Sequence, residues 1–187
     1  MDLIAPGRNV VLIGLMGAGK STVGRILAER LGRPFVDTDD LVEDEAGMAI
    51  RDIFAEKGER AFRSLESEAV RRVSALRGQV VAVGGGAVST PGNATQLRMT
   101  GDLVLLDADP AVLAERLGTD VEDRPMVAEA DDLAARLAEL RRRRDHDYAR
   151  AASCTVRTDG RTPEEVADAI LDWARHRPGL LSRDERE

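Results

Sequence analysis

The segment from Asn9 to Leu31 constrains the fold more than any other part of the chain. Its first residues, Asn9–Ile13, form an uninterrupted run rich in β-branched residues, which is typical of a buried β-strand. Next comes Gly14-Leu-Met-Gly-Ala-Gly-Lys-Ser21, which matches G-x-x-x-x-G-K-[ST] and leads into a helical stretch that ends before Gly32. Such a loop turns backbone N–H groups inward, and the helix N-terminus adds partial positive charge. These residues therefore predict a nucleoside triphosphate site.

The scarcity of lysine strengthens this interpretation. Only two of the 27 basic residues are lysines, and one of them, Lys20, occupies the lysine position of the motif. There Lys20 is expected to reach the β- and γ-phosphates, and the Ser21 hydroxyl to ligate Mg²⁺. The alternative is a glycine-rich turn matched by chance, which the flanking strand and helix disfavour. GTPases and ATPase motors share the loop, but the chain length and the lack of an Asn-Lys-x-Asp motif favour a small-molecule kinase.

Short β-type runs alternate with longer helical ones along the chain. This alternation predicts an α/β fold with a parallel sheet covered by helices on both faces. The further expected strands are 34–37, 80–83, 103–106 and 153–157. We expect one domain over residues 1–177, because 187 residues suit a single core. Residues 118–130 lack periodicity and predict a mobile loop, whereas 178–187 are polar and predict a disordered tail.

Composition excludes several classes of function. The net charge is −7 and aromatic residues make up 3%, which argues against a nucleic-acid partner. The single cysteine, Cys154, cannot form an internal disulfide, and the two histidines do not complete a zinc site with it. No stretch is long and apolar enough to span a membrane. We expect a cytoplasmic protein, and nothing in the sequence requires more than a monomer.

Carboxylates gather at the end of the second expected strand, in Asp37-Thr38-Asp39-Asp40. Ligands of parallel sheets bind at the carboxyl ends of the strands, so these side chains are expected beside the phosphate loop. One carboxylate can hold Mg²⁺ through water, and another can accept the proton of an attacking hydroxyl. The alternative is helix capping, which needs only one such residue.

Glycines follow the third expected strand as Gly84-Gly85-Gly86. They either expose N–H groups and leave room for a ligand or form a tight turn. A different signal is Arg144, which continues the apolar stripe of the helix expected over 131–149. A guanidinium on an inward face needs an anionic partner.

Two further arginines have open interpretations. Arg63 lies three residues before Glu66 on an expected helix. This is either a surface ion pair or a glutamate that steadies an arginine for a substrate carboxylate. Arg124 lies in the 118–130 loop and is either an exposed charge or a residue that closes over the phosphates.

Taken in order, these motifs resemble the shikimate kinase family over residues 8 to 175. The resemblance rests on the phosphate loop, Phe-Val-Asp37-Thr-Asp39, Phe62-Arg63…Glu66, the triple glycine, Arg124-Pro125 and the Arg144…Tyr148 spacing. It implies transfer of the γ-phosphate of ATP to the 3-hydroxyl of shikimate, in the route to aromatic amino acids. It also implies a P-loop fold of the nucleoside monophosphate kinase type. In that fold a five-stranded parallel sheet of order 2-3-1-4-5 carries a mobile lid.

The resemblance also implies roles for individual residues. Asp39 would be the base and bind shikimate, with Lys20 and Arg124 as further catalytic residues. One Mg²⁺ would be bound by Ser21 and, through water, by Asp37. The shikimate site would comprise Asp39, Arg63, Gly85, Gly86 and Arg144. The ATP site would comprise Gly17, Ala18, Gly19, Lys20, Ser21, Thr22, Arg116, Arg124 and Arg161. Rival interpretations are a gluconate kinase of the same fold and a regulatory module without catalysis, although Lys20, Asp39 and Arg124 are all present.

Overall fold

The computed structural model describes residues 7–118, 125–128 and 130–186. Its centre is a five-stranded sheet in the order β2-β3-β1-β4-β5, and every neighbouring pair is parallel. The strands are β1 (Asn9–Ile13), β2 (Phe35–Asp37), β3 (Val80–Ala82), β4 (Gly101–Asp107) and β5 (Cys154–Arg157). The predicted α/β class, sheet and strand order are confirmed.

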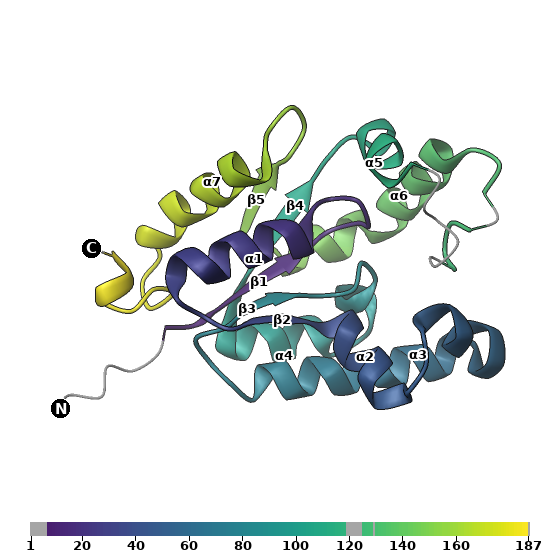
Figure 1. Ribbon diagram of the computed structural model, residues 1–187, viewed down its shortest axis with the longest axis horizontal. Helices are drawn as coiled ribbons and strands as arrows, with labels where there is room; N and C mark the ends of the chain where they lie inside the picture. Colours follow the sequence, from purple (N-terminus) through teal and green to yellow (C-terminus); the bar gives the residue numbers. More distant parts are fainter. Residues whose placement is uncertain (1–6, 119–124, 129, 187) are drawn as a thin grey trace.

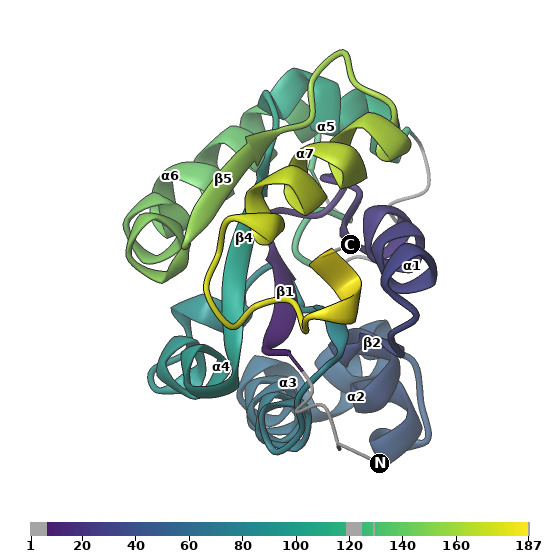
Figure 2. The ribbon, with the colours of Figure 1, turned by 90° about the vertical axis from the view of Figure 1, so that its left-hand side faces the viewer.

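Helices cover both faces of this sheet, as Figures 1 and 2 show. Helices α1 and α7 pack together on one face, and α4 and α6 lie on the other. The helices are α1 (Lys20–Leu31), α2 (Thr38–Ala46), α3 (Ile50–Ser74), α4 (Asn93–Thr100), α5 (Pro110–Leu117), α6 (Leu133–Ala151) and α7 (Pro163–Arg175). Two short 3₁₀ turns are η1 (Ala87–Ser89) and η2 (Asp184–Arg186). No helix in these described ranges is long and apolar enough to cross a membrane.

The central strand β1 is buried along its whole length, which explains why every residue after Asn9 is apolar. It pairs with β3 on one side and β4 on the other, so the loop that follows it starts in the middle of the sheet. At Gly14 the backbone has φ 139°, and a Cβ there would lie 2.3 Å from the Leu106 carbonyl oxygen. The first glycine of the motif therefore allows the loop to leave the sheet in close contact with β4.

The end of the chain differs from its prediction. Leu180 and Leu181 are buried in the core, and Glu185 forms an ion pair with Arg33 of the α1–β2 turn. Arg33 also donates to the carbonyl oxygens of Arg8 and Leu180. The prediction of a disordered tail is therefore wrong for residues 178–186. Two leucines and one carboxylate hold this segment on the core, although its other residues are polar.

Candidate functional site: a phosphate loop facing a buried acceptor pocket

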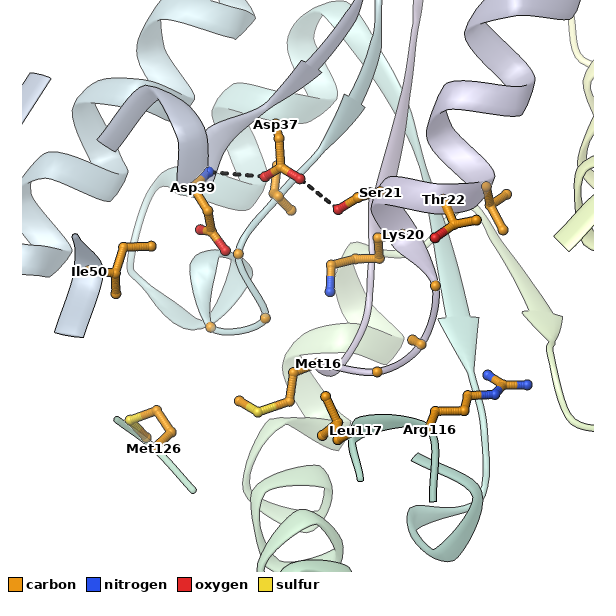
Figure 3. Close-up of a pocket in the computed structure, with 18 of the residues that line it drawn as sticks. Met16, Lys20, Ser21, Thr22, Asp37, Asp39, Ile50, Arg116, Leu117 and Met126 are labelled. Atoms are coloured by element: carbon orange, nitrogen blue, oxygen red, sulfur yellow. Dashed lines mark hydrogen bonds between the residues drawn. The ribbon is translucent and has the colours of Figure 1, made fainter. Parts of the chain in front are cut away.

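The phosphate loop joins β1 to α1, and Lys20 is the first residue of that helix. The Lys20 Nζ donates to the carbonyl oxygens of Gly14 at 3.0 Å and Leu15 at 3.1 Å. Its ammonium group therefore lies over the loop, where Figure 3 shows it near Met16. Gly19 caps α1 with a left-handed backbone, so no side chain covers the positive end of the helix. The loop and helix together form a site for an anion.

Asp37, the last residue of β2, makes two contacts at once (Figure 3). One oxygen accepts from the Asp39 N–H at 3.1 Å and caps α2. The other accepts from the Ser21 hydroxyl at 2.7 Å. The capping interpretation is thus correct for Asp37, but it does not exclude the functional one, because the second oxygen faces the phosphate loop.

These oxygens also decide which metal fits the site. A hydroxyl and a carboxylate beside a phosphate loop are hard ligands of the kind that Mg²⁺ accepts together with water and phosphate oxygens. Within the ranges that the structure describes, no group of three or more histidine, cysteine or acidic side chains is placed to hold a metal. The Ser21 hydroxyl and the Asp37 carboxylate fit a magnesium ion whose other ligands are water and phosphate oxygens.

Asp39 lies in the first turn of α2 and borders the cavity that contains the phosphate loop. Burial raises the pKa of its carboxyl to about 6; Asp37 adds to this shift and Lys20 opposes it. Its Oδ1 atom is buried without a hydrogen-bond partner in the described structure. A carboxylate with a pKa close to neutral and an unused oxygen is suited to accepting a proton.

The triple glycine is explained by close packing with other side chains. A Cβ at Gly84 would lie 2.8 Å from both Asp39 Oδ1 and Glu66 Oε1. A Cβ at Gly86 would lie 2.6 Å from a guanidinium nitrogen of Arg63. None of the three has a positive φ. Their missing side chains therefore make room for the charged groups of the cavity.

Two arginines from different helices line the cavity near the glycine loop that packs against Asp39 and Glu66. Arg63 on α3 donates to Glu66 at 2.9 Å and to Glu59 at 3.1 Å, so the pair seen in the sequence holds the guanidinium in place. Burial raises the pKa of Glu66, and Arg63 opposes that shift. Arg144 on α6 is 7% exposed, and its buried Nη1 atom has no hydrogen-bond partner in the described structure. An unpartnered buried guanidinium nitrogen favours an anionic ligand.

The opposite end of the cavity lies beside α5 and the β5–α7 loop. Arg116 donates to the Thr158 hydroxyl at 2.8 Å and to the Thr158 carbonyl oxygen at 2.6 Å. Arg161 and Pro163 line the same region. Arg116 and Arg161, the two arginines predicted for the ATP site, thus line one cavity, although they belong to elements far apart in the sequence.

One cavity of about 610 Å³ joins these parts. Of the predicted site residues it brings together Gly17, Ala18, Gly19, Lys20, Ser21, Thr22, Asp37, Asp39, Arg63, Gly85, Gly86, Arg116, Arg144 and Arg161. Arg124 and the neighbouring residues 119–123 lie outside the described residues.

The apolar wall of this cavity was not predicted from the sequence. Met16, Ile50, Phe54, Phe62, Leu117 and Met126 line it beside the charged groups. The rings of Phe54 and Phe62 pack at a tilt of 39°, with their centroids 4.7 Å apart. Helical spacing gives no sign of this role, because apolar residues at these positions are equally typical of a core. Only the contacts across elements distinguish a cavity wall from a core.

A mononucleotide-type phosphate loop that faces an acceptor pocket with a carboxylate and two arginines defines a small-molecule kinase of the P-loop class. A family model described as shikimate kinase matches residues 16–175. The chain belongs to the shikimate kinase family, and it is an ATP-dependent kinase.

Known shikimate kinases are similar to this protein over nearly the whole chain. A shikimate kinase of Symbiobacterium thermophilum is 48% identical over 170 residues, which is 90% of this chain and 97% of that protein. A shikimate kinase of Geobacter sulfurreducens is 43% identical over 175 residues, covering 94% and 95% of the two chains. The shikimate kinase of Acinetobacter baumannii, solved in complex with shikimate, matches with a TM-score of 0.85 and 34% identity over 89% of this chain and 92% of that one.

Proposed function

We propose that this protein transfers the γ-phosphate of ATP to the 3-hydroxyl of shikimate and releases shikimate 3-phosphate and ADP. The observation that carries this proposal is the buried Nη1 of Arg144, which has no partner in the described structure and lines the same cavity as the phosphate loop. Shikimate combines a carboxylate with ring hydroxyls, so it supplies both an anion for the arginines and a nucleophile for the phosphate. Family membership supports the same reaction.

The phosphates of ATP would bind the backbone N–H groups of residues 17 to 22 and the ammonium group of Lys20. Lys20 already lies over the loop, so it needs only to exchange carbonyl oxygens for phosphate oxygens. Arg116 and Arg161 would flank the adenine, which is supported by their position in the same cavity as the phosphate loop. This arrangement would direct the γ-phosphate toward Asp39.

Asp39 would accept the proton of the 3-hydroxyl. As that O–H bond breaks, the oxygen forms a bond to the γ-phosphorus, and the bond to the β–γ bridging oxygen breaks with its electron pair leaving on ADP. A pKa of about 6 leaves most Asp39 carboxylates ionised at neutral pH and still basic enough to take the proton.

Arg63 and Arg144 would hold the shikimate carboxylate between α3 and α6. The planar fork of a guanidinium matches two carboxylate oxygens, and Glu66 keeps Arg63 in place. Gly85 and Gly86 would contact the bound molecule through their backbone, because both line the cavity without a side chain. The substrate would thereby be held with one hydroxyl toward Asp39.

Ser21 would ligate one Mg²⁺ directly and Asp37 would bind it through water, which their 2.7 Å hydrogen bond and hard oxygen donors support. When bound, Mg²⁺ neutralises charge on the β- and γ-phosphate oxygens. We extend the proposal to a single kinase domain over residues 1–177, with acceptor contacts from about 38–66 and a lid over about 118–130. In that lid Arg124 would contact the transferred phosphate.

The test is ADP release measured with Mg-ATP and four acceptor conditions: shikimate, gluconate, a nucleoside monophosphate and none. Turnover with shikimate alone is expected. Turnover with gluconate or a nucleoside monophosphate instead would keep the phosphate loop and exclude the acceptor site proposed here. ATP binding without turnover in any condition would favour a regulatory module.

A further inference from the structure

Tyr148 is the only tyrosine in the chain, and it lies on α6 one turn after Arg144. Its side chain is 4% exposed and belongs to the hydrophobic core. The hydroxyl donates to the Gly85 carbonyl oxygen at 2.5 Å, across 63 residues of sequence. A phenylalanine would fill the same space without placing a polar atom there, so the hydroxyl is explained by the group that it holds.

That group is one face of a peptide unit in the glycine loop. The Gly85 carbonyl and the Gly86 N–H belong to the same planar trans peptide, so they point in opposite directions. A hydrogen bond from Tyr148 to the carbonyl therefore directs the Gly86 N–H away from Tyr148. Gly86 lines the cavity at the acceptor end. Because glycine has no Cβ to restrict its backbone, this peptide needs an outside contact to keep one orientation.

The neighbouring peptide groups of Gly84 form hydrogen bonds with residues outside α6. The Gly84 N–H donates to the buried Thr38 hydroxyl at 3.2 Å. The Gly84 carbonyl accepts from the Ala87 N–H at 3.0 Å. Among the described hydrogen bonds of residues 84–86, only the one from the Tyr148 hydroxyl connects this loop to helix α6. The loop and Arg144 are therefore tied to one another through one turn of α6.

The contact between Arg144 and the loop is close. A Cβ at Gly85 would lie 3.3 Å from Arg144 Nη1, so a small rotation of the Gly85–Gly86 peptide would change what that nitrogen faces. Burial raises the pKa of Tyr148 to about 12, against the opposing charge of Arg144. The hydroxyl thus remains a hydrogen-bond donor throughout the working pH range.

We propose that Tyr148 is a positioning residue for the acceptor: its hydroxyl fixes the Gly85–Gly86 peptide so that the Gly86 N–H and Arg144 together meet the substrate carboxylate. This inference rests on the proposed function of the same cavity. It assigns Tyr148 no contact with the substrate or with ATP.

The test is Tyr148→Phe in the full chain, with steady-state kinetics for both substrates. One neutral hydrogen bond corresponds to roughly a 3- to 10-fold rise in KM for shikimate. We expect the KM for ATP to stay within about twofold. The control is Leu137→Val, which removes packing from the same buried stripe of α6 without touching the loop. An unchanged KM for shikimate, or an equal rise in both KM values, would overturn the proposal.

A second measurement separates this inference from the proposed function. Amide hydrogen exchange of a peptide covering residues 84–88 is measured without any substrate, in wild type, Tyr148→Phe and Leu137→Val. Faster exchange in Tyr148→Phe alone is the expected result, because the loop loses its tie to α6. Equal exchange in all three proteins would contradict the positioning role, even where shikimate is phosphorylated. Faster exchange in a protein that does not phosphorylate shikimate would instead keep the tie and reject the proposed function.

Discussion

At the scale of single residues, the site uses side chains that each meet a structural and a chemical need. Asp37 caps α2 with one oxygen and holds Ser21 with the other. Asp39 is the clearest case of conflict between the two needs. Its burial beside Asp37 raises its pKa to about 6, which suits proton transfer but makes the ionised form costly in the folded protein.

Asp39→Asn is expected to remove nearly all turnover, because an amide cannot accept the proton, while ATP still binds. In wild type the same carboxyl should give kcat/KM for shikimate an acidic limb that falls below about pH 6. The measurement is a pH–rate profile with ATP binding followed separately by calorimetry. Substantial turnover in the variant would exclude Asp39 as the base.

The raised pKa of Asp39 also predicts a change in stability. The folded state binds this proton more tightly than the unfolded state, so the contribution to stability is present below about pH 4 and is lost as pH rises through about 6. Asp39→Asn should therefore stabilise the ligand-free protein at pH 8, by about 1–3 kcal/mol. The difference should vanish near pH 4. Denaturant unfolding at both pH values measures it, and a variant less stable than wild type at pH 8 would contradict the prediction.

Arg144 offers a matched comparison on one helix. Arg144→Ala should raise the KM for shikimate by at least about tenfold, because a charged hydrogen-bonding partner of the carboxylate is lost. The KM for ATP should change far less. Arg142→Ala is the control, since Arg142 is exposed on the same helix two residues earlier. An equal rise in the KM values for shikimate and ATP would exclude Arg144 as a ligand of the shikimate carboxylate.

At the scale of elements, glycine is required in two loops for different structural reasons. In the phosphate loop, Gly14 has a positive φ and lies against the backbone of β4. After β3, Gly86 has an ordinary φ of −102° and lies against the flexible end of Arg63. The first glycine is required by the backbone, and the second by the side chains of the site.

This difference predicts opposite outcomes for alanine substitutions. Gly86→Ala should displace the Arg63 guanidinium and raise the KM for shikimate severalfold, with little loss of melting temperature. Gly14→Ala should lower the melting temperature strongly, because the Cβ meets the Leu106 carbonyl and the φ is strained. Thermal unfolding and steady-state kinetics of both variants test the contrast. A strongly destabilised Gly86→Ala with an unaltered KM would refute it.

At the scale of the whole molecule, the C-terminal segment packs on the hydrophobic core and contacts Arg8, which directly precedes β1. The Arg33 guanidinium is bound by Glu185 and by two carbonyl oxygens, and these contacts span up to 152 residues of sequence. Leu180 and Leu181 belong to the hydrophobic core. These contacts join the C-terminal segment to the turn that follows α1, the helix that carries the phosphate loop.

Glu185→Gln is expected to lower the free energy of unfolding by about 1–3 kcal/mol at pH 7, because buried Arg33 loses its charged partner. Burial raises the pKa of Glu185, but the hydrogen bonds from Arg33 and from a backbone N–H outweigh burial and lower this pKa to about 2. The contribution should thus be complete above about pH 4.5 and fall as pH approaches 2. Asp184→Asn, at an exposed neighbouring position, is the control. Denaturant unfolding measures both, and equal stability of all three proteins would exclude the role of this ion pair.

Features that lie within one short segment could be predicted from the amino-acid sequence. The phosphate loop, the parallel strands and the inward position of Arg144 follow from glycine spacing and from apolar periodicity, which are local properties of the chain. The pairing of Arg63 with Glu66 follows likewise, since both lie on one face of one helix.

The contacts between distant segments come from the folded structure. It placed the triple glycine against Asp39, Glu66 and Arg63, turned Phe54 and Phe62 into a cavity wall, and joined Tyr148 to Gly85. It also ordered the C-terminal segment that composition alone describes as disordered. The physical reason is the same in each case. Such contacts depend on the register and crossing of separate elements, and no spacing within a single element records where its partner will lie.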